Sequence, residues 1–203
     1  MHSVNYILQL TDDVVLSRNA ATAGEHETLD YVPGSALLGA AAALLYKTLK
    51  ADQKAFEAFH SGAVRFGNAL PCSQGEQGLP MPLCWHERKG DSALRNGRID
   101  AAKIRNFQTA SFADHEQPAQ LRGGYVTPSG RVLQPEITYR MKTAVDPAVG
   151  RAANGQLFGY ASVRAGSLFC GQIDADDREL LERIRAALAN AGSIRIGRSR
   201  ATE

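Results

Sequence analysis

The chain of 203 residues has no apolar stretch long enough to span a bilayer. Its most apolar run, residues 36–49, is too short and contains Lys47. The N-terminus also lacks the basic segment followed by an apolar segment that marks a signal peptide. These absences argue against a membrane-spanning protein, and we expect a cytoplasmic protein that makes no contact with a membrane.

Cysteine is scarce as well. The three cysteines include no Cys-x-x-Cys pair, which argues against a disulfide framework. Cys72, Cys84 and His86 fall in one segment rich in Pro and Gly. A zinc site there would need a fourth ligand such as His60 or His115, and the spacing differs from the usual zinc patterns. We therefore expect buried or loop thiols, and neither a metal nor another cofactor.

The chain has no large excess of either charge, because 23 Lys and Arg stand against 21 Asp and Glu. Any nucleic-acid surface must therefore be local. The content of hydrophobic residues, 44%, is ordinary for a globular protein, and the sequence has no repeat or low-complexity tract. We expect residues 1–203 to form a single domain with its own core.

Apolar periodicity predicts an α+β protein. The helices are expected at residues 35–49, 54–59 and 177–190, where Phe56 and Phe59 should share an apolar face of the second. Strands are expected at residues 4–10, 64–66, 137–142, 157–163, 167–173 and 193–196. This order is that of a ferredoxin-like fold. Residues 71–97 and 111–130 are rich in Gly, Pro and charge, and we expect them to be loop insertions.

The opening of the first helix is the most informative local feature. Pro33 and Gly34 break the preceding chain, and Ser35 is expected to be the N-cap of the helix. The first turn contains no acidic side chain, so its backbone N–H groups could bind a phosphate. Gly39, one turn later, would let another backbone come close.

Four segments resemble, in order, the RAMP superfamily, the RNA-binding subunits of CRISPR-Cas effector complexes. Residues 31–39, Tyr-Val-Pro-Gly-Ser-x-Leu-x-Gly, resemble its helix-opening motif. Residues 65–71, with residues 79–83 and Lys89, look like the segment of subunits that cap the 5′ end of a guide RNA. The others are residues 141–147, which lead through 150–153 to 155–160, and residues 192–200, which resemble the entry to a glycine-rich loop.

This resemblance implies a non-catalytic subunit that holds the 5′ handle of the guide RNA in RNA-guided antiviral defence, most like the handle-capping subunits of type III-D systems. Its implied partners are the guide RNA, the neighbouring RAMP backbone subunits and the large subunit. Relatives continue beyond the Gly-Arg-Ser-Arg segment, so we expect the glycine-rich loop near residues 192–203 to be completed by further residues or by a partner.

The expected RNA-binding surface is a basic saddle around the opening of the first helix. Its candidate residues are Arg18, Tyr31, Pro33, Gly34, Ser35, Gly39, Arg140, Lys142, Arg195, Gly197, Arg198 and Arg200. Loop residues that could fold over it are Lys103, Arg105 and Arg122, and candidates for stacking on bases, besides Tyr31, are Tyr125 and Tyr160. Solvated surface charge and core packing are the alternative explanations for any single one of them.

Two catalytic alternatives stay open. RAMP backbone subunits cut target RNA with a metal and an aspartate in the loop after the first strand. The equivalent loop here contains the oxygen ligands Asp12, Asp13, Glu25, Glu27 and Asp30, but the pattern usual around that aspartate is not recognisable. His26 and His60 could act as base and acid in metal-free RNA cleavage. We expect no catalytic residues.

Overall fold

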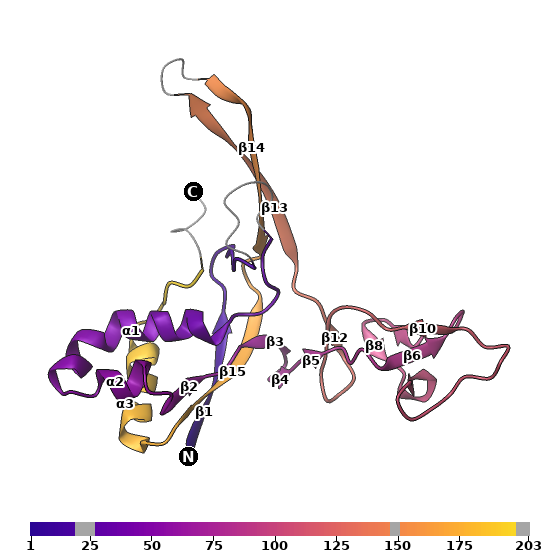
Figure 1. Cartoon of the computed structure of the whole chain (residues 1–203), viewed down its shortest axis with the longest axis horizontal. Coiled ribbons are helices and arrows are strands. Elements are labelled where there is room, and N and C mark those ends of the chain that lie inside the picture. The colour runs from indigo at the N-terminus through magenta and orange to yellow at the C-terminus, as the bar shows by residue number, and fades with distance from the viewer. Residues whose placement is uncertain (19–26, 147–150, 198–203) are drawn as a thin grey trace. The chain divides into compact units, whose positions relative to one another are not determined.

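A computed structural model describes residues 1–18, 27–146 and 151–197, and the chain divides into two compact units (Figure 1). Unit 1 comprises residues 1–69 and 136–203, and unit 2 comprises residues 70–135. Both expected insertions, residues 71–97 and 111–130, lie within unit 2. The α-helices of the described residues all belong to unit 1.

The sheet of unit 1 has β15 (Leu168–Ala175) at its centre. The edge strand β1 (His2–Gln9) pairs with β15 in antiparallel register along its whole length. The short strand β2 (Val64–Phe66) pairs with the opposite edge of β15. These pairings confirm the strands predicted at residues 4–10, 64–66 and 167–173.

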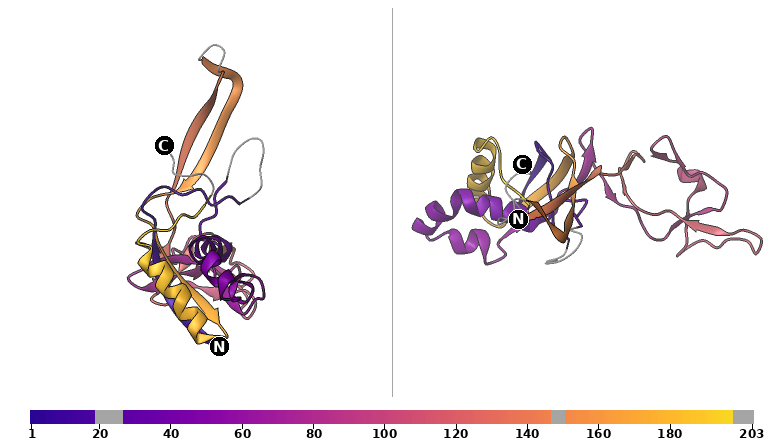
Figure 2. Two further views of the ribbon diagram at one scale, coloured as in Figure 1. Left: turned by 90° about the vertical axis from the view of Figure 1, so that its left-hand side faces the viewer. Right: turned by 90° about the horizontal axis from the view of Figure 1, so that it is seen from above.

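Three helices pack on one face of this sheet: α1 (Gly34–Ala51), α2 (Ala55–Phe59) and α3 (Arg178–Asn190) (Figure 2). Their apolar side chains bury Ile173 of β15, which is 1% exposed. The helices predicted at residues 35–49, 54–59 and 177–190 are thus confirmed. The architecture is a mixed α/β fold.

The prediction for Phe56 is wrong, because its side chain is 66% exposed. Helix α2 has only five residues, and Ala55, Ala58 and Phe59 already fill its buried side.

A long antiparallel hairpin rises from unit 1, formed by β13 (Ile137–Asp146) and β14 (Arg151–Val163) (Figure 1). It contains the strands predicted at residues 137–142 and 157–163 and extends well beyond them. At its base, Val163 forms a bridge with Val14 of the loop after β1. Figure 1 shows the hairpin reaching away from the helices.

The strand predicted at residues 193–196 is wrong, because this segment is irregular coil. Gly192 has a left-handed φ of +68°, and the chain turns there before it continues. Ile194 packs on the helix-covered core and Ile196 on a second core cluster, while Arg195 is exposed. The alternating pattern thus reflects packing on two cores and not pairing with a neighbouring strand.

Unit 2 is built from short strands and turns, as its Gly and Pro content favours. Its strands are β3 (Leu70–Ser73), β4 (Glu76–Gln77), β5 (Leu79–Pro80), β6 (Trp85–Arg88), β7 (Leu94–Arg95), β8 (Arg98–Ile99), β9 (Arg105–Asn106), β10 (Pro118–Gln120), β11 (Tyr125–Val126) and β12 (Val132–Leu133). A 3₁₀ turn, η1, spans Ala101–Lys103. Strand β6 lies between β9 and β10, and β11 lies between β5 and β12.

Candidate nucleic-acid interface

A second core cluster in unit 1 brings the candidate segments together. Its buried members are Leu10, Leu16, Val32, Ala69, Val163 and Phe169, and Ala36, Ile137 and Ile196 pack against it. These side chains come from the loop after β1, the opening of α1, the base of the β13–β14 hairpin and the coil after α3. Four segments distant in sequence therefore surround the start of α1.

The opening of α1 is anchored by residues 68 and 69. The backbone groups of Val32 and Ala69 exchange two hydrogen bonds of 2.9 and 2.8 Å. The Gly34 N–H donates to Asn68 Oδ1 at 2.9 Å, so a side chain from another segment caps the helix. Sequence reasoning missed Asn68, because no local pattern links two residues so far apart.

The assignment of Ser35 as the N-cap is wrong. Pro33 occupies that position, with extended φ and ψ of −66° and 141°, and the cap makes no side-chain hydrogen bond. Ser35 is the second helical residue and its side chain is exposed. The first turn carries no acidic residue. One of its N–H groups is already taken by Asn68, which narrows the site available to a phosphate.

The two glycines of α1 have different surroundings. A Cβ at Gly34 would lie 1.9 Å from the carbonyl oxygen of Phe66, so the fold itself requires glycine there. A Cβ at Gly39 would meet nothing within 4 Å, and Gly39 is exposed. Ser35 and Gly39 are four residues apart and lie on one accessible side of the helix.

Asp13 organises the base of the hairpin. Its carboxylate accepts hydrogen bonds from the Ala165 backbone N–H at 2.9 Å and from Arg140 Nη2 at 3.0 Å, and the Thr138 hydroxyl lies 3.3 Å away. The side chain is 13% exposed. The Ala165 N–H is the main reason that the pKa of Asp13 is lowered, and Thr138 and Arg140 lower it further against the opposing effect of burial.

This ion pair changes the interpretation of two candidates. Asp13, considered as a metal ligand, has its oxygens committed to protein donors. One N–H group of the Arg140 guanidinium binds Asp13, but the side chain is 48% exposed and its other N–H donors stay available. Arg140 can therefore still face a ligand from the base of the hairpin.

The coil after α3 presents Arg195 and Gly197. Arg195 is exposed and forms no ion pair within the described residues. Gly197 has a φ of +87°, and a Cβ there would lie 2.7 Å from the Val15 carbonyl oxygen. Gly197 is thus held closely against the loop after β1, and it places Arg195 near the second core cluster.

The remaining candidates are dispersed. Arg18 is exposed and lies 3.4 Å from Glu27, and Tyr31 is half-buried immediately before α1. Lys142 lies in β13, but its side chain is outside the described part, as are Arg198 and Arg200. His26 and Glu25 also lie outside the described residues.

The loop candidates for covering the RNA and one candidate for stacking on bases all belong to unit 2: Lys103, Arg105, Arg122 and Tyr125. The side chain of Tyr125 is 5% exposed, which contradicts a role in stacking on bases.

The possible zinc ligands have other surroundings. Cys72 is buried in β3, and His86 Nδ1 lies 3.1 Å from the Cys84 carbonyl oxygen. The His86 ring packs on Phe107 at 4.7 Å between centroids. In the described part of the chain, no three His, Cys, Asp or Glu side chains are placed to hold a metal ion.

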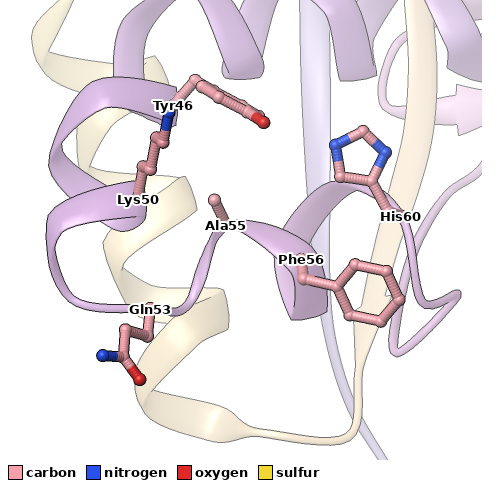
Figure 3. A pocket seen from close by; sticks show the side chains of 6 residues that line it. All are labelled: Tyr46, Lys50, Gln53, Ala55, Phe56 and His60. Atoms are coloured by element: carbon pink, nitrogen blue, oxygen red, sulfur yellow. The ribbon is translucent and has the colours of Figure 1, made fainter.

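A shallow cavity of about 250 Å³ lies at the other end of α1, where the chain turns into α2 (Figure 3). It is lined by Tyr46, Lys50, Gln53, Ala55, Phe56 and His60. The His60 ring lies edge-on to Tyr46 and is stacked with Phe56 at an interplanar angle of 29°. An 18-residue helix is about 27 Å long. His60 therefore lies far from the opening of α1.

Comparison with known proteins shows which solved structures have a similar fold. No family model matches the sequence, and no curated protein matches it significantly. Two cryo-EM structures of a type III-B Cmr-beta complex contain a chain of similar structure, one bound to cognate target RNA and one in the apo state. The TM-scores are 0.52 and 0.53, with 10% and 8% sequence identity, and each match covers 97% of this chain and 92% of the other. The fold of this chain is thus similar to that of a chain in the Cmr-beta structures.

At this level of identity the match concerns the fold alone. The α+β class predicted from the sequence is confirmed as a mixed α/β architecture. Within the described residues, no helix is both long and apolar enough to cross a membrane.

Proposed function

We propose that this chain is an RNA-binding RAMP subunit of a type III CRISPR ribonucleoprotein and that it holds the 5′ handle of the guide RNA without cutting RNA itself. The convergence of four segments around the opening of α1 carries this proposal. The second core cluster contains residues from three of the four segments that resemble RAMP proteins, namely Val32, Ala69 and Ile196. The likeness to a chain of Cmr-beta supports the same class of assembly.

The local chemistry suits an RNA backbone. The accessible side of α1 offers Ser35 and Gly39, with no acidic side chain in the first turn. Arg140 and Arg195 present guanidinium groups from the hairpin base and the final coil. Helix N–H groups and guanidinium groups both bind phosphates, and such contacts fix an RNA backbone independently of its sequence.

The proposal includes a ferredoxin-like RAMP fold for unit 1. The order β1, α1, β2, β15, α3 and the sheet order β1-β15-β2 support it. The final strand of that fold would lie next to β1, after α3. Neighbouring RAMP backbone subunits and the large subunit are the proposed protein partners, and the cytoplasm is the proposed location.

The decisive experiment uses Gly39, since Gly34 cannot be changed without disturbing the fold. Gly39→Val should fold normally, because the position is open and valine is at least as compatible with a helix as glycine. Its binding to handle RNA should weaken by about tenfold, or about 1.4 kcal/mol, because the added side chain keeps the RNA backbone away from α1. Gly39→Ala is the matched control and should give a smaller loss.

A second variant tests the arginines. Arg195→Ala combined with Arg198→Ala should weaken the binding of handle RNA and reduce its salt dependence, by about 0.7 in the logarithmic slope for each phosphate that the variant no longer binds. An unchanged affinity and slope would remove these arginines from the site. Subunit stoichiometry in the assembled complex separates a handle cap, present once, from a backbone subunit, present several times.

A further inference from the structure

Unit 2 contains a row of three arginines on the β7–β8 hairpin and the segment beside it. Strands β7 and β8 form a hairpin in which Arg95 and Arg98 are direct cross-strand partners. The two residues between them, Asn96 and Gly97, both have positive φ, 50° and 70°, as in a type I′ turn. Arg131, in the segment on the other side of β8, forms an antiparallel bridge with Arg98.

The backbone hydrogen bonds fix this row. Val132 N–H donates to the Gly97 carbonyl and Ile99 N–H to the Gly130 carbonyl, each at 2.7 Å. These bonds flank the Arg98–Arg131 pair, which is therefore the closer, non-hydrogen-bonded kind of antiparallel pair. Direct partners project to the same face, so the three arginine side chains leave one face of the three strands side by side.

Like charges placed directly opposite one another destabilise a hairpin, so this arrangement calls for an anion. Within the described residues neither Arg95 nor Arg98 forms an ion pair, and both are exposed. Arg131 is held by two neutral acceptors, Ser73 Oγ at 3.3 Å and Gln74 Oε1 at 2.7 Å. Arg95 and Arg98 thus keep a positive charge that no ion pair of the described residues cancels.

Several carboxylates of unit 2 bind groups other than Arg95 and Arg98. Asp91 and Glu116 lie near Arg88, Glu116 also binds Arg105, and Glu87 accepts the Ala93 N–H. Glu76 accepts a hydrogen bond from the Ser129 hydroxyl, which is the main reason that its pKa is lowered, and the charge of Arg131 is a smaller cause. Within the described residues no carboxylate forms an ion pair with Arg95 or Arg98, so we expect their anion to come from outside unit 2.

We propose that Arg95, Arg98 and Arg131 form a second nucleic-acid contact, which binds the phosphodiester backbone of a single strand. Such a backbone supplies one negative charge at every nucleotide, and guanidinium groups bind phosphate oxygens in pairs. Within the β7–β8 hairpin no apolar side chain shares the face of Arg95 and Arg98, because Leu94 and Ile99 pair on the opposite face, so the hairpin offers no apolar anchor there. A protein interface would need such an anchor at its centre.

This contact lies in unit 2, whereas the proposed binding surface for the 5′ handle lies in unit 1. The proposal of this second contact depends on the proposed function in one respect only, which is that the ligand is a nucleic acid. The probe is therefore a labelled uridine oligonucleotide, which contains no handle sequence. Its binding to the full chain is followed by fluorescence anisotropy across a salt titration.

The test variant is Arg95→Gln combined with Arg98→Gln. Its logarithmic salt slope should be smaller by about 1.4, that is about 0.7 for each of two phosphate contacts. Between about 50 and 200 mM salt, the unmodified chain should therefore lose about sevenfold more affinity than the variant. The variant should unfold at the same temperature or slightly higher, because a repulsive pair has been removed.

The matched control is Lys47→Gln combined with Lys50→Gln, which makes the same change of net charge on exposed residues of α1. Equal slopes for the two double variants would overturn the proposal, since net charge alone would then explain the effect. Tight binding of polyglutamate that depends on Arg95 and Arg98, without binding of the oligonucleotide, would also overturn it in favour of an acidic protein partner. The proposed binding of the 5′ handle by unit 1 is tested separately. It is refuted if Arg195→Ala leaves the binding of handle RNA unchanged, whatever the result for Arg95 and Arg98.

Discussion

Removing the carboxylate of Asp13 should destabilise unit 1 without abolishing RNA cleavage. Asp13→Ala removes the acceptor of the Ala165 N–H and the ion pair with Arg140. Hydrogen bonds to a charged group contribute about 1.5–3 kcal/mol each when buried. Arg140 is half exposed, so solvent weakens its share, and we expect a total loss of about 2–3 kcal/mol. Asp13→Asn retains an acceptor for Ala165 and should lose about half as much.

The assay follows from where the spectroscopic probes lie. All α-helices of the described residues are in unit 1, so urea unfolding followed by far-UV circular dichroism reports on unit 1. The single tryptophan, Trp85, reports on unit 2 by fluorescence. Asp13→Ala should shift the dichroism midpoint more than the fluorescence midpoint. Asp12→Ala is the control, because Asp12 is exposed and should cost less than about 0.5 kcal/mol.

The pH dependence of the free energy of unfolding gives a second test of the role of Asp13. The pKa of Asp13 is lowered on folding, so its stabilisation is present in full above about pH 4, the ordinary pKa of aspartate. It is lost as the pH falls through the lower, folded pKa. The difference in stability between the wild-type chain and Asp13→Ala should therefore be constant near neutral pH and shrink in acid. Equal stability of the two chains at pH 7 would refute this account.

The same variant separates the structural role from the metal-site alternative. In a reconstituted complex, Asp12→Ala, Asp13→Ala and Asp30→Ala should leave target-RNA cleavage intact. Loss of one regularly placed cut that requires Mg²⁺, with normal assembly, would instead favour a backbone subunit with metal-dependent endoribonuclease activity.

Three further predictions concern the fold of unit 1. Asn68→Ala should cost about 1 kcal/mol in chemical denaturation because it uncaps α1, whereas Ser35→Ala should change stability by less than about 0.5 kcal/mol. Gly171→Ala should cost about 1–3 kcal/mol, because its Cβ would lie within 3 Å of the cross-strand ring of Tyr6, and combination with Tyr6→Leu should be less than additive. Burial, followed by the nearby Cys170, raises the pKa of Tyr6 to about 12, so its stabilisation should be lost between about pH 10 and pH 12. Tyr6→Phe should abolish that loss in alkaline unfolding experiments, and an unchanged alkaline profile would refute it.

The sequence by itself predicts the elements whose signals are local. Helix α1 follows from Pro33 and Gly34 before an Ala- and Leu-rich run, and α3 follows from the spacing of its apolar residues. The strands of unit 1 are predictable because alternation and β-branched residues act within a few positions. The resemblance to RAMP proteins likewise comes from short motifs in order.

Tertiary structure decided the contacts on which the candidate sites depend. Asn68, not Ser35, caps α1, and Asp13 binds Arg140 across 127 positions of sequence. The alternation at residues 193–196 resembles that of a strand because packing on two cores produces the same pattern. Local propensities act over one or two turns of chain, whereas a cap, an ion pair or a row of arginines depends on which distant segments meet. Core packing and backbone pairing determine which distant segments come into contact, and a short sequence pattern contains no information on either.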